Sequence, residues 1–160
     1  MKKEIARQLM NTPSFRFSID YNDIAAIHDA LYRYNLTKTG AERVEVSADR
    51  FPEQQAILVC DQTGKVHGGI AFHRIDEPRR IFVDYFFLDE STRGRGFGKR
   101  IFNEFLTWAK QFDAKEIELT TNTFQAPNFY LKMGFQITNS KPAPVPLLPE
   151  NIHYSLRKVL

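Results

Sequence analysis

Near the middle of this 160-residue chain, a run with three glycines in six residues separates an apolar segment from an amphipathic one. The residues of Ile81–Leu88 are almost all β-branched or aromatic, which predicts a buried strand. From Gly98 to Phe112, apolar residues recur at helical spacing with charged residues between them, which predicts a helix. Residues 93–98 therefore form a tight turn directly between a strand and the first turn of a helix.

This arrangement predicts a phosphate-binding turn. The first turn of a helix leaves its backbone N–H groups without intrahelical partners, and the aligned peptide dipoles place partial positive charge there. Glycines let the backbone approach an anion closely, so a pyrophosphate fits. Two nucleotide motifs are excluded: Lys99 stands where a dinucleotide fingerprint needs its third glycine, and Arg100 stands where a P-loop needs Ser or Thr. An RNA-binding Arg-Gly tract and a turn with spare glycines are the remaining alternatives.

Composition indicates one globular domain over residues 1–160, because 42% of the residues are apolar and 26% are charged. No apolar run approaches the roughly 20 residues of a membrane span, and charges occupy the start of the chain where a signal peptide is apolar. We therefore expect a cytoplasmic protein with no membrane partner. The single cysteine, Cys60, excludes an internal disulfide and is predicted to be a small core residue. A net charge of +3 suits an anionic ligand but does not predict a nucleic-acid partner.

The order of predicted elements gives a mixed α/β fold. We expect strands at 15–20, 56–60, 66–73, 81–88, 116–121, 135–138 and about 152–158, and helices from Asn22 or Asp23, from Gly98 and after Pro127. The hairpin at Asp61–Lys65 makes its two strands antiparallel, whereas the long helix crosses over between parallel strands. The prediction is a sheet of about seven strands, antiparallel and parallel, flanked by helices. Residues 1–13 are an N-terminal extension, and 38–54 are a loop with room for a short helix.

Two separated signatures resemble those of the GNAT superfamily of N-acetyltransferases. The first is Arg93-x-x-Gly96-x-Gly98, which follows a strand ending in Phe-Phe-Leu. The second is the stretch 126–135, Ala-Pro-Asn-Phe-Tyr-Leu-Lys-Met-Gly-Phe. The resemblance is strongest over 81–137, which it implies to be the acetyl-CoA-binding core. It implies an acetyltransferase that passes the acetyl group of acetyl-CoA, its cosubstrate, directly to an amine.

The resemblance also implies which residues bind the coenzyme. The pyrophosphate is assigned to the backbone of Arg93, Gly94, Arg95, Gly96, Phe97, Gly98 and Lys99. The side chains of Arg95 and Lys99 either add charge there or form a solvated basic face. The pantetheine arm is assigned to the splayed strand end, Phe86, Phe87 and Leu88, and further contacts to Asn122, Phe129 and Tyr130. Thr123 stands where relatives carry an asparagine, and Asn122 is adjacent.

The same resemblance implies the catalytic groups. A backbone N–H near Leu88 acts as an oxyanion hole, an effect worth about 3 kcal/mol per donor. Tyr130 matches the tyrosine that acts as general acid beside the sulfur in many relatives, or else it belongs to an apolar cluster with its neighbours. The base is Asp84, His73 or a water chain, and the alternative for Asp84 is a hydrogen-bonded strand-end residue. The four histidines show no metal-ligand spacing, so we expect no metal.

The acceptor is not encoded in these motifs. In this fold, residues 33–54 and Ser140–Asn151 border the acceptor cleft, and Tyr32, Tyr34 and Phe51 are candidates for its wall. Four prolines, at 142, 144, 146 and 149, stiffen the second segment, and a PxxP docking site is the rival interpretation. The leading expectation is a small-molecule primary amine. The alternatives are a protein N-terminus or lysine, and a non-catalytic coenzyme A-binding module. A homodimer is compatible with this fold.

Overall fold

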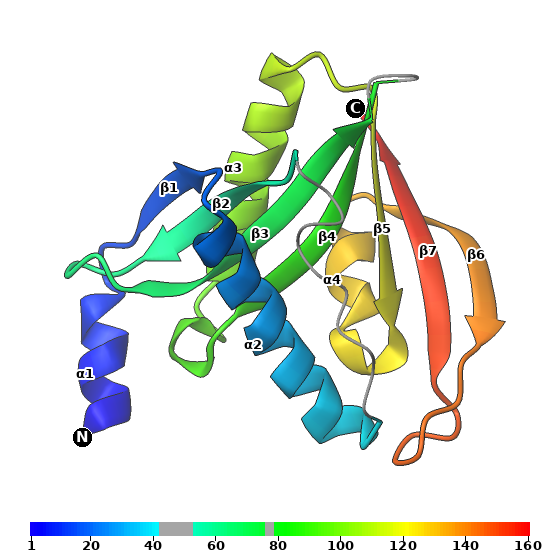
Figure 1. The fold of residues 1–160 in the computed structure, drawn as a ribbon, viewed down its shortest axis with the longest axis horizontal. Coiled ribbons are helices and arrows are strands. Elements are labelled where there is room, and N and C mark those ends of the chain that lie inside the picture. Colours follow the sequence, from blue (N-terminus) through cyan, green and yellow to red (C-terminus); the bar gives the residue numbers. More distant parts are fainter. Residues whose placement is uncertain (42–52, 76–78) are drawn as a thin grey trace.

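A computed structural model describes residues 1–41, 53–75 and 79–160. Its centre is a seven-stranded sheet with the order β1-β2-β3-β4-β5-β7-β6 (Figure 1). The strands are β1 (Ser14–Ser18), β2 (Gln55–Cys60), β3 (Val66–Ile75), β4 (Arg80–Leu88), β5 (Glu116–Asn122), β6 (Gln136–Pro142) and β7 (Ile152–Val159). β4 and β5 pair in parallel, and the other neighbours pair antiparallel. The predicted mixed α/β sheet of about seven strands is confirmed.

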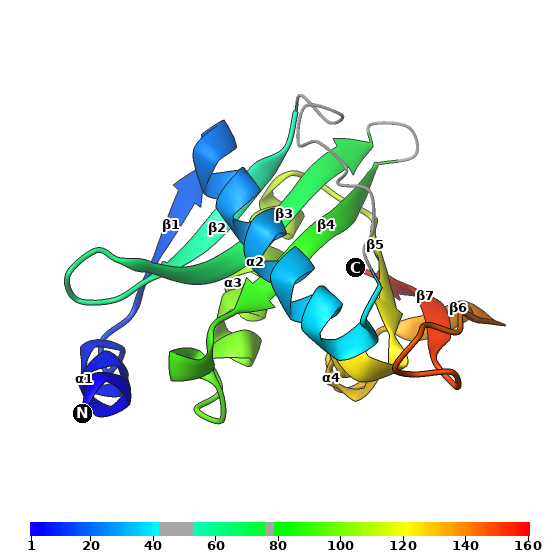
Figure 2. The same ribbon diagram turned by 60° about the horizontal axis from the view of Figure 1, so that its bottom comes forward.

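Helices cover both faces of this sheet. They are α1 (Lys2–Leu9), α2 (Tyr21–Thr39), α3 (Phe97–Gln111) and α4 (Pro127–Lys132), with short 3₁₀ turns η2 (Glu90–Thr92) and η3 (Thr123–Gln125). α2 crosses one face over β3 and β4, and α3 lies against the opposite face (Figures 1 and 2). Within the described ranges, no helix is both long and apolar enough to cross a bilayer.

The two faces of the sheet carry two separate apolar clusters. The larger one packs the apolar stripe of α3, including Ile101, Phe102 and Phe105, against the sheet. The smaller one packs Ile24 and Ile27 of α2 against residues of β2 and β3, among them Cys60. Each fully buried side chain of this size contributes about 2 kcal/mol. Cys60 is a buried core residue, as predicted.

Several predicted boundaries were wrong, and the caps of α2 explain two of them. Asp20, not Asn22 or Asp23, caps this helix, because its carboxylate accepts the Asn22 N–H at 2.7 Å. Gly40 ends the helix in the left-handed region, so α2 includes the start of the segment expected to be a loop. The predicted extension 1–13 contains α1, and β6 continues to Pro142. Within that predicted loop, residues 42–52 lie outside the described residues.

Candidate active site

A cavity opens where the parallel strands β4 and β5 separate. Their ladder pairs 80–82 with 116–118 and ends there. Beyond that point the strands diverge, and α4 lies at the opening (Figure 1). The cavity has a volume of about 340 Å³, which is a size typical of small-molecule sites. Its lining residues are Leu31, Tyr34, Val83, Asp84, Phe86, Phe87, Arg93, Leu119, Thr120, Thr121, Phe124, Gln125, Ala126, Phe129 and Tyr130.

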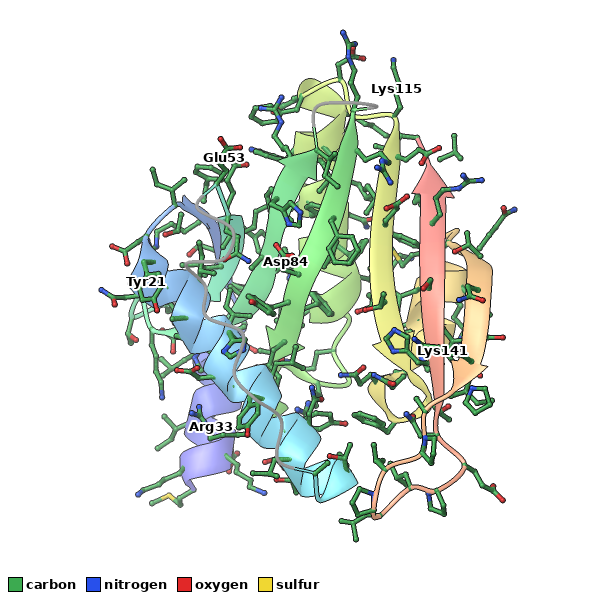
Figure 3. The ribbon with its side chains drawn as sticks, turned by 45° about the vertical axis from the view of Figure 1, so that its right-hand side comes forward. Tyr21, Arg33, Glu53, Asp84, Lys115 and Lys141 are labelled. Carbon is green, nitrogen blue, oxygen red and sulfur yellow. The ribbon has the colours of Figure 1, made fainter. Side chains whose placement is uncertain are left out.

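Asp84 occupies a β-bulge that places its side chain in the lining of this cavity. β3 pairs Ala71 with Tyr85 and Phe72 with Val83, so Asp84 is the extra residue on β4. A bulge interrupts the alternation of side chains along a strand. Val83 and Asp84 therefore both line the cavity, although they are consecutive. Figure 3 shows Asp84 near the middle of β4.

Asp84 and His73 form one hydrogen-bonded pair. The Nδ1 atom of His73 lies 3.0 Å from Oδ1 and 2.9 Å from Oδ2 of Asp84. Gln54 also donates to Oδ2, at 3.1 Å, and the Asp84 side chain is 4% exposed. The two candidate bases of the sequence are therefore parts of the same unit. Gln54 was missed, because no motif or spacing in the sequence marks it.

Tyr130 belongs both to the aromatic core and to the cavity lining. The apolar cluster expected for it is present, and its role as general acid stays a prediction. Its ring packs against Phe102 and Phe135 with centroids 5.9 Å apart, and against Phe129 at 5.3 Å. Burial raises the pKa of the Tyr130 phenol well above its usual range. The hydroxyl therefore stays protonated at neutral pH and keeps a proton that it can donate.

The predicted phosphate-binding turn has the backbone shape that an anion site requires. Gly94 and Gly96 adopt φ of 73° and 78°, which side chains other than glycine rarely adopt. Gly96 is the N-cap of α3 and provides no side-chain cap. The first helical bond runs from the Arg100 N–H to the Gly96 carbonyl. The N–H groups of Phe97, Gly98 and Lys99 therefore precede the first intrahelical bond.

The basic side chains of the turn differ in what they contact. Arg95 donates to Oδ1 of Asn11 at 2.6 Å, which links it to the N-terminal segment. Arg93 donates to the Leu88 carbonyl at 3.3 Å, and its guanidinium lies 5.5 Å from the Tyr34 ring centroid. Lys99 is exposed. The Arg93 side chain thus helps to close one end of the cavity.

Asn122 is committed to a buried amide network at the end of β5. Its Nδ2 donates to Oε1 of Gln125 at 2.9 Å, and its Oδ1 accepts from Nδ2 of Asn151 at 3.1 Å. Gln125 in turn donates to Oδ1 of Asn35 on α2 at 2.9 Å. These bonds fix η3 against α2. The coenzyme contact assigned to Asn122 stays a prediction. Asn122 itself is buried, with 6% of its surface exposed.

The expected walls of the acceptor cleft are partly present. Tyr34 lines the cavity, whereas Tyr32 stacks on His28, with ring centroids 6.4 Å apart. Phe51 lies outside the described residues. The proline-rich segment contacts the end of α2, where the Leu147 N–H donates to the Thr39 carbonyl at 3.0 Å. This segment lines a neighbouring cavity of about 470 Å³, which shares Phe124 with the first.

Splayed parallel strands, a glycine turn at a helix start, a carboxylate–imidazole pair and a buried phenol thus meet at or beside one cavity. Among the described residues, no three His, Cys, Asp or Glu side chains are grouped as metal ligands. Acetyl-CoA fits this site, because the unpaired N–H groups and left-handed glycines form a cradle for its pyrophosphate.

Comparison with known proteins gives the family. Residues 21–135 match the model of the acetyltransferase (GNAT) family, and the chain belongs to that family. It is 30% identical over 101 residues to blasticidin-S acetyltransferase of Streptomyces morookaense, covering 62% of this chain and 73% of that protein. The family makes this protein an N-acetyltransferase that uses acetyl-CoA.

Two solved structures show the same fold. A GCN5-related N-acetyltransferase from Kribbella flavida has a TM-score of 0.71 at 15% identity, covering 92% of this chain and 98% of that chain. The yncA protein of Salmonella typhimurium, solved with its cofactor acetyl-CoA, has a TM-score of 0.69 at 16% identity. That match covers 94% of this chain and 95% of that chain.

Proposed function

We propose that the protein transfers the acetyl group of acetyl-CoA to a primary amine of a small molecule by direct attack in a ternary complex. The observation that carries this proposal is that Asp84, bonded to His73, and Tyr130 line the same cavity. A proton acceptor and a proton donor thus meet in one space. Aminolysis of a thioester requires both, because the amine must lose a proton and the leaving thiolate gains one.

The proposed donor site follows the end of β4. The N–H groups of Phe97, Gly98 and Lys99 hold the pyrophosphate, and Phe86 to Leu88 pair with the pantetheine arm. When bound, acetyl-CoA supplies an activated carbonyl, and the N–H near Leu88 stabilises the charge on its oxygen. The end of the β4–β5 ladder supports this assignment, because this stretch of β4 has no β5 partner in the described ladder.

The proposed proton transfers use two groups that line the same cavity. The Asp84–His73 pair accepts the proton that the attacking ammonium loses. Tyr130 donates a proton to the departing sulfur, and its raised pKa keeps that proton in place until the transfer. The Asp84 carboxylate faces the cavity, while the imidazole bonded to it helps to accommodate the charge.

The proposed acceptor is a small molecule because of the shape of the site. The cavity of about 340 Å³ is lined by aromatic side chains, among them Tyr34 and Phe124. Phe124 also lines the neighbouring cavity, so the two can hold different parts of one acceptor. The similarity to blasticidin-S acetyltransferase supports a small-molecule acceptor. Blasticidin S is therefore the first compound to test.

A thiol-release assay with acetyl-CoA and a panel of amines tests the proposal. The panel contains blasticidin S, polyamines, amino acids, and peptides with a free N-terminus or lysine. We expect turnover with at least one small amine. Turnover with peptides alone would make the protein a peptide or protein acetyltransferase. Tight binding of coenzyme A with no turnover of any amine would make it a binding module.

A further inference from the structure

A second histidine–carboxylate cluster lies beside the glycine turn, outside the lining of the active-site cavity. His67 is bonded through Nε2 to Oδ2 of Asp61 and through Nδ1 to Oδ2 of Asp89, both at 2.7 Å. The Ser91 hydroxyl donates to Oδ1 of Asp89 at 2.5 Å. The His67 side chain is 4% exposed. These bonds join the hairpin between β2 and β3 to the segment that follows β4.

Both ring nitrogens of His67 lie at hydrogen-bonding distance from a carboxylate oxygen, so the ring joins Asp61 to Asp89. Asp61 is ionised, because hydrogen bonds from Thr63 and His67 hold its pKa well below the usual range. The Asp89 side chain is 38% exposed. The Ser91 hydroxyl contacts both partners, since its oxygen lies 2.5 Å from Oδ1 of Asp89 and 3.0 Å from Nδ1 of His67.

Asp89 links His67 to the glycine turn. Its Oδ1 accepts the Ser91 N–H at 3.1 Å and caps η2, and its own N–H donates to the His67 carbonyl at 2.9 Å. Thr92 donates to the Asp89 carbonyl through both its N–H and its hydroxyl, at 3.1 and 2.7 Å. After η2, only Arg93 precedes the first glycine of the turn. The carboxylate that His67 holds therefore sets where the turn begins.

We propose that His67 is a positioning residue that fixes the glycine turn through Asp89 and thereby sets the affinity for the nucleotide half of acetyl-CoA. This inference rests on the proposed function, in which that turn binds the pyrophosphate. His67 does not line the active-site cavity, so it leaves the chemical step to Asp84 and Tyr130. Its effect is on binding, because a displaced turn aims its N–H groups away from the phosphates.

His67→Gln is the direct variant, and the remaining hydrogen bonds favour its folding. Oδ1 of Asp61 keeps the Thr63 N–H, the Thr63 hydroxyl and the Lys65 N–H. Asp89 keeps both donors of Ser91. Asp89→Asn tests the same link from its more exposed end and leaves the buried ring unchanged. If His67→Gln does not fold, Asp89→Asn decides the question.

The experiment compares two acetyl donors in steady-state kinetics. Acetyl-CoA carries the pyrophosphate, whereas acetyl-pantetheine has the same thioester and no nucleotide. We expect His67→Gln and Asp89→Asn each to raise KM for acetyl-CoA by about tenfold, with kcat changed less than about twofold. With acetyl-pantetheine, kcat/KM stays within about twofold of the wild type, because there is no pyrophosphate to misplace. A merely structural defect would instead weaken both donors equally.

His28→Gln is the matched control, because His28 also contacts a carboxylate, Asp29 at 3.1 Å, but lies on α2. We expect it to leave both KM values unchanged. Equal losses with both donors, or no loss with either, overturn the role of His67. A wild type that uses both donors with the same KM instead overturns the assignment of the turn in the proposed function. If no amine is acetylated, calorimetry with coenzyme A and pantetheine gives the same comparison as binding constants.

Discussion

β3 carries two histidines, and each contacts an aspartate. His73 contacts Asp84 within β4, and His67 contacts Asp89, the residue that follows β4. The two clusters nevertheless differ in chemistry. In the described contacts, the Nδ1 atom of His73 meets one carboxylate, Asp84, which lines the cavity. His67 lies between two carboxylates, Asp61 and Asp89, and neither lines that cavity.

The position of each cluster explains the difference. Asp84 lines the cavity, where an acceptor amine can reach it, so we propose the Asp84–His73 pair as the base. Both ring nitrogens of His67 contact carboxylates outside the lining of that cavity, so we propose this cluster as a support of the glycine turn. The same residue types therefore give the proposed base at one end of β3 and the proposed support at the other.

Asp84→Asn should have the largest effect, because it removes the proton acceptor while keeping the shape of the side chain. We expect kcat to fall by about a thousandfold with both acetyl-CoA and acetyl-pantetheine, and KM for either donor to change little. Asp89→Asn is the matched variant in the other cluster, where only KM for acetyl-CoA should change. If the two variants lose kcat alike, the distinction between the clusters is wrong. Steady-state thiol release measures both constants.

Tyr130→Phe should have the next largest effect. It removes one hydroxyl and keeps the ring in its aromatic packing, so we expect a loss of kcat of about a hundredfold or more without loss of stability. Because the pKa of Tyr130 is raised, the wild-type rate should not decline through ionisation of Tyr130 as pH rises to its usual value of 10.0. Tyr154→Phe, outside the cavity lining, serves as control. An unchanged rate in Tyr130→Phe refutes the general-acid role.

The order of elements and the active-site cavity were predictable because both follow local patterns. Runs of β-branched and aromatic residues predicted the strands, and the two glycine-containing signatures predicted the turn and α4. The family resemblance carried by these signatures pointed to Asp84, His73 and Tyr130 as candidates. The sequence could not show that Asp84 and His73 are bonded, because that contact depends on a bulge in the β3–β4 register.

The second cluster was not predictable for a different reason. Asp61, His67 and Asp89 are spread over three segments and belong to no motif, and each is an ordinary turn or strand residue by itself. His67 was placed in a hairpin strand without a role. Only the pairing of β3 with β4, which ends at Gly68 and Leu88, brings it next to the start of the glycine turn.

The cluster of Asp61, His67 and Asp89 should also change how the stability of the fold depends on pH. The pKa of Asp61 in the folded protein lies below its ordinary value of 3.8, so its ionised form stabilises the fold above that pH. This contribution is lost as pH falls through 3.8 toward the folded pKa. Asp61→Asn should therefore lower Tm by several degrees near neutral pH, and the difference from the wild type should shrink below about pH 4.

Asp113→Asn is the control for this experiment. Hydrogen bonding and charge from Lys115, together with Arg79, also lower the pKa of Asp113, but its side chain is 61% exposed. Ion pairs in water contribute little and are screened by salt. We therefore expect a much smaller change of Tm, which salt abolishes. Equal decreases of Tm in Asp61→Asn and Asp113→Asn would show that the buried bonds of Asp61 stabilise the fold no more than an exposed ion pair does. Thermal unfolding at several pH values provides the data.

The smallest expected effect comes from alanine substitutions that compare Gly96 in the glycine turn with Gly64 in the β2–β3 hairpin. Gly96 and Gly64 have φ of 78° and 86°, and a Cβ added at either would meet nothing within 4 Å. Alanine at either position therefore costs only the strain of a left-handed backbone, about 1 kcal/mol, and both variants should lose similar stability in urea unfolding. Only Gly96→Ala should also raise KM for acetyl-CoA, by about threefold, because this strain shifts the N–H groups that face the phosphates. A similar increase in Gly64→Ala would mean that the hairpin itself governs coenzyme binding, since no proposed donor contact lies there.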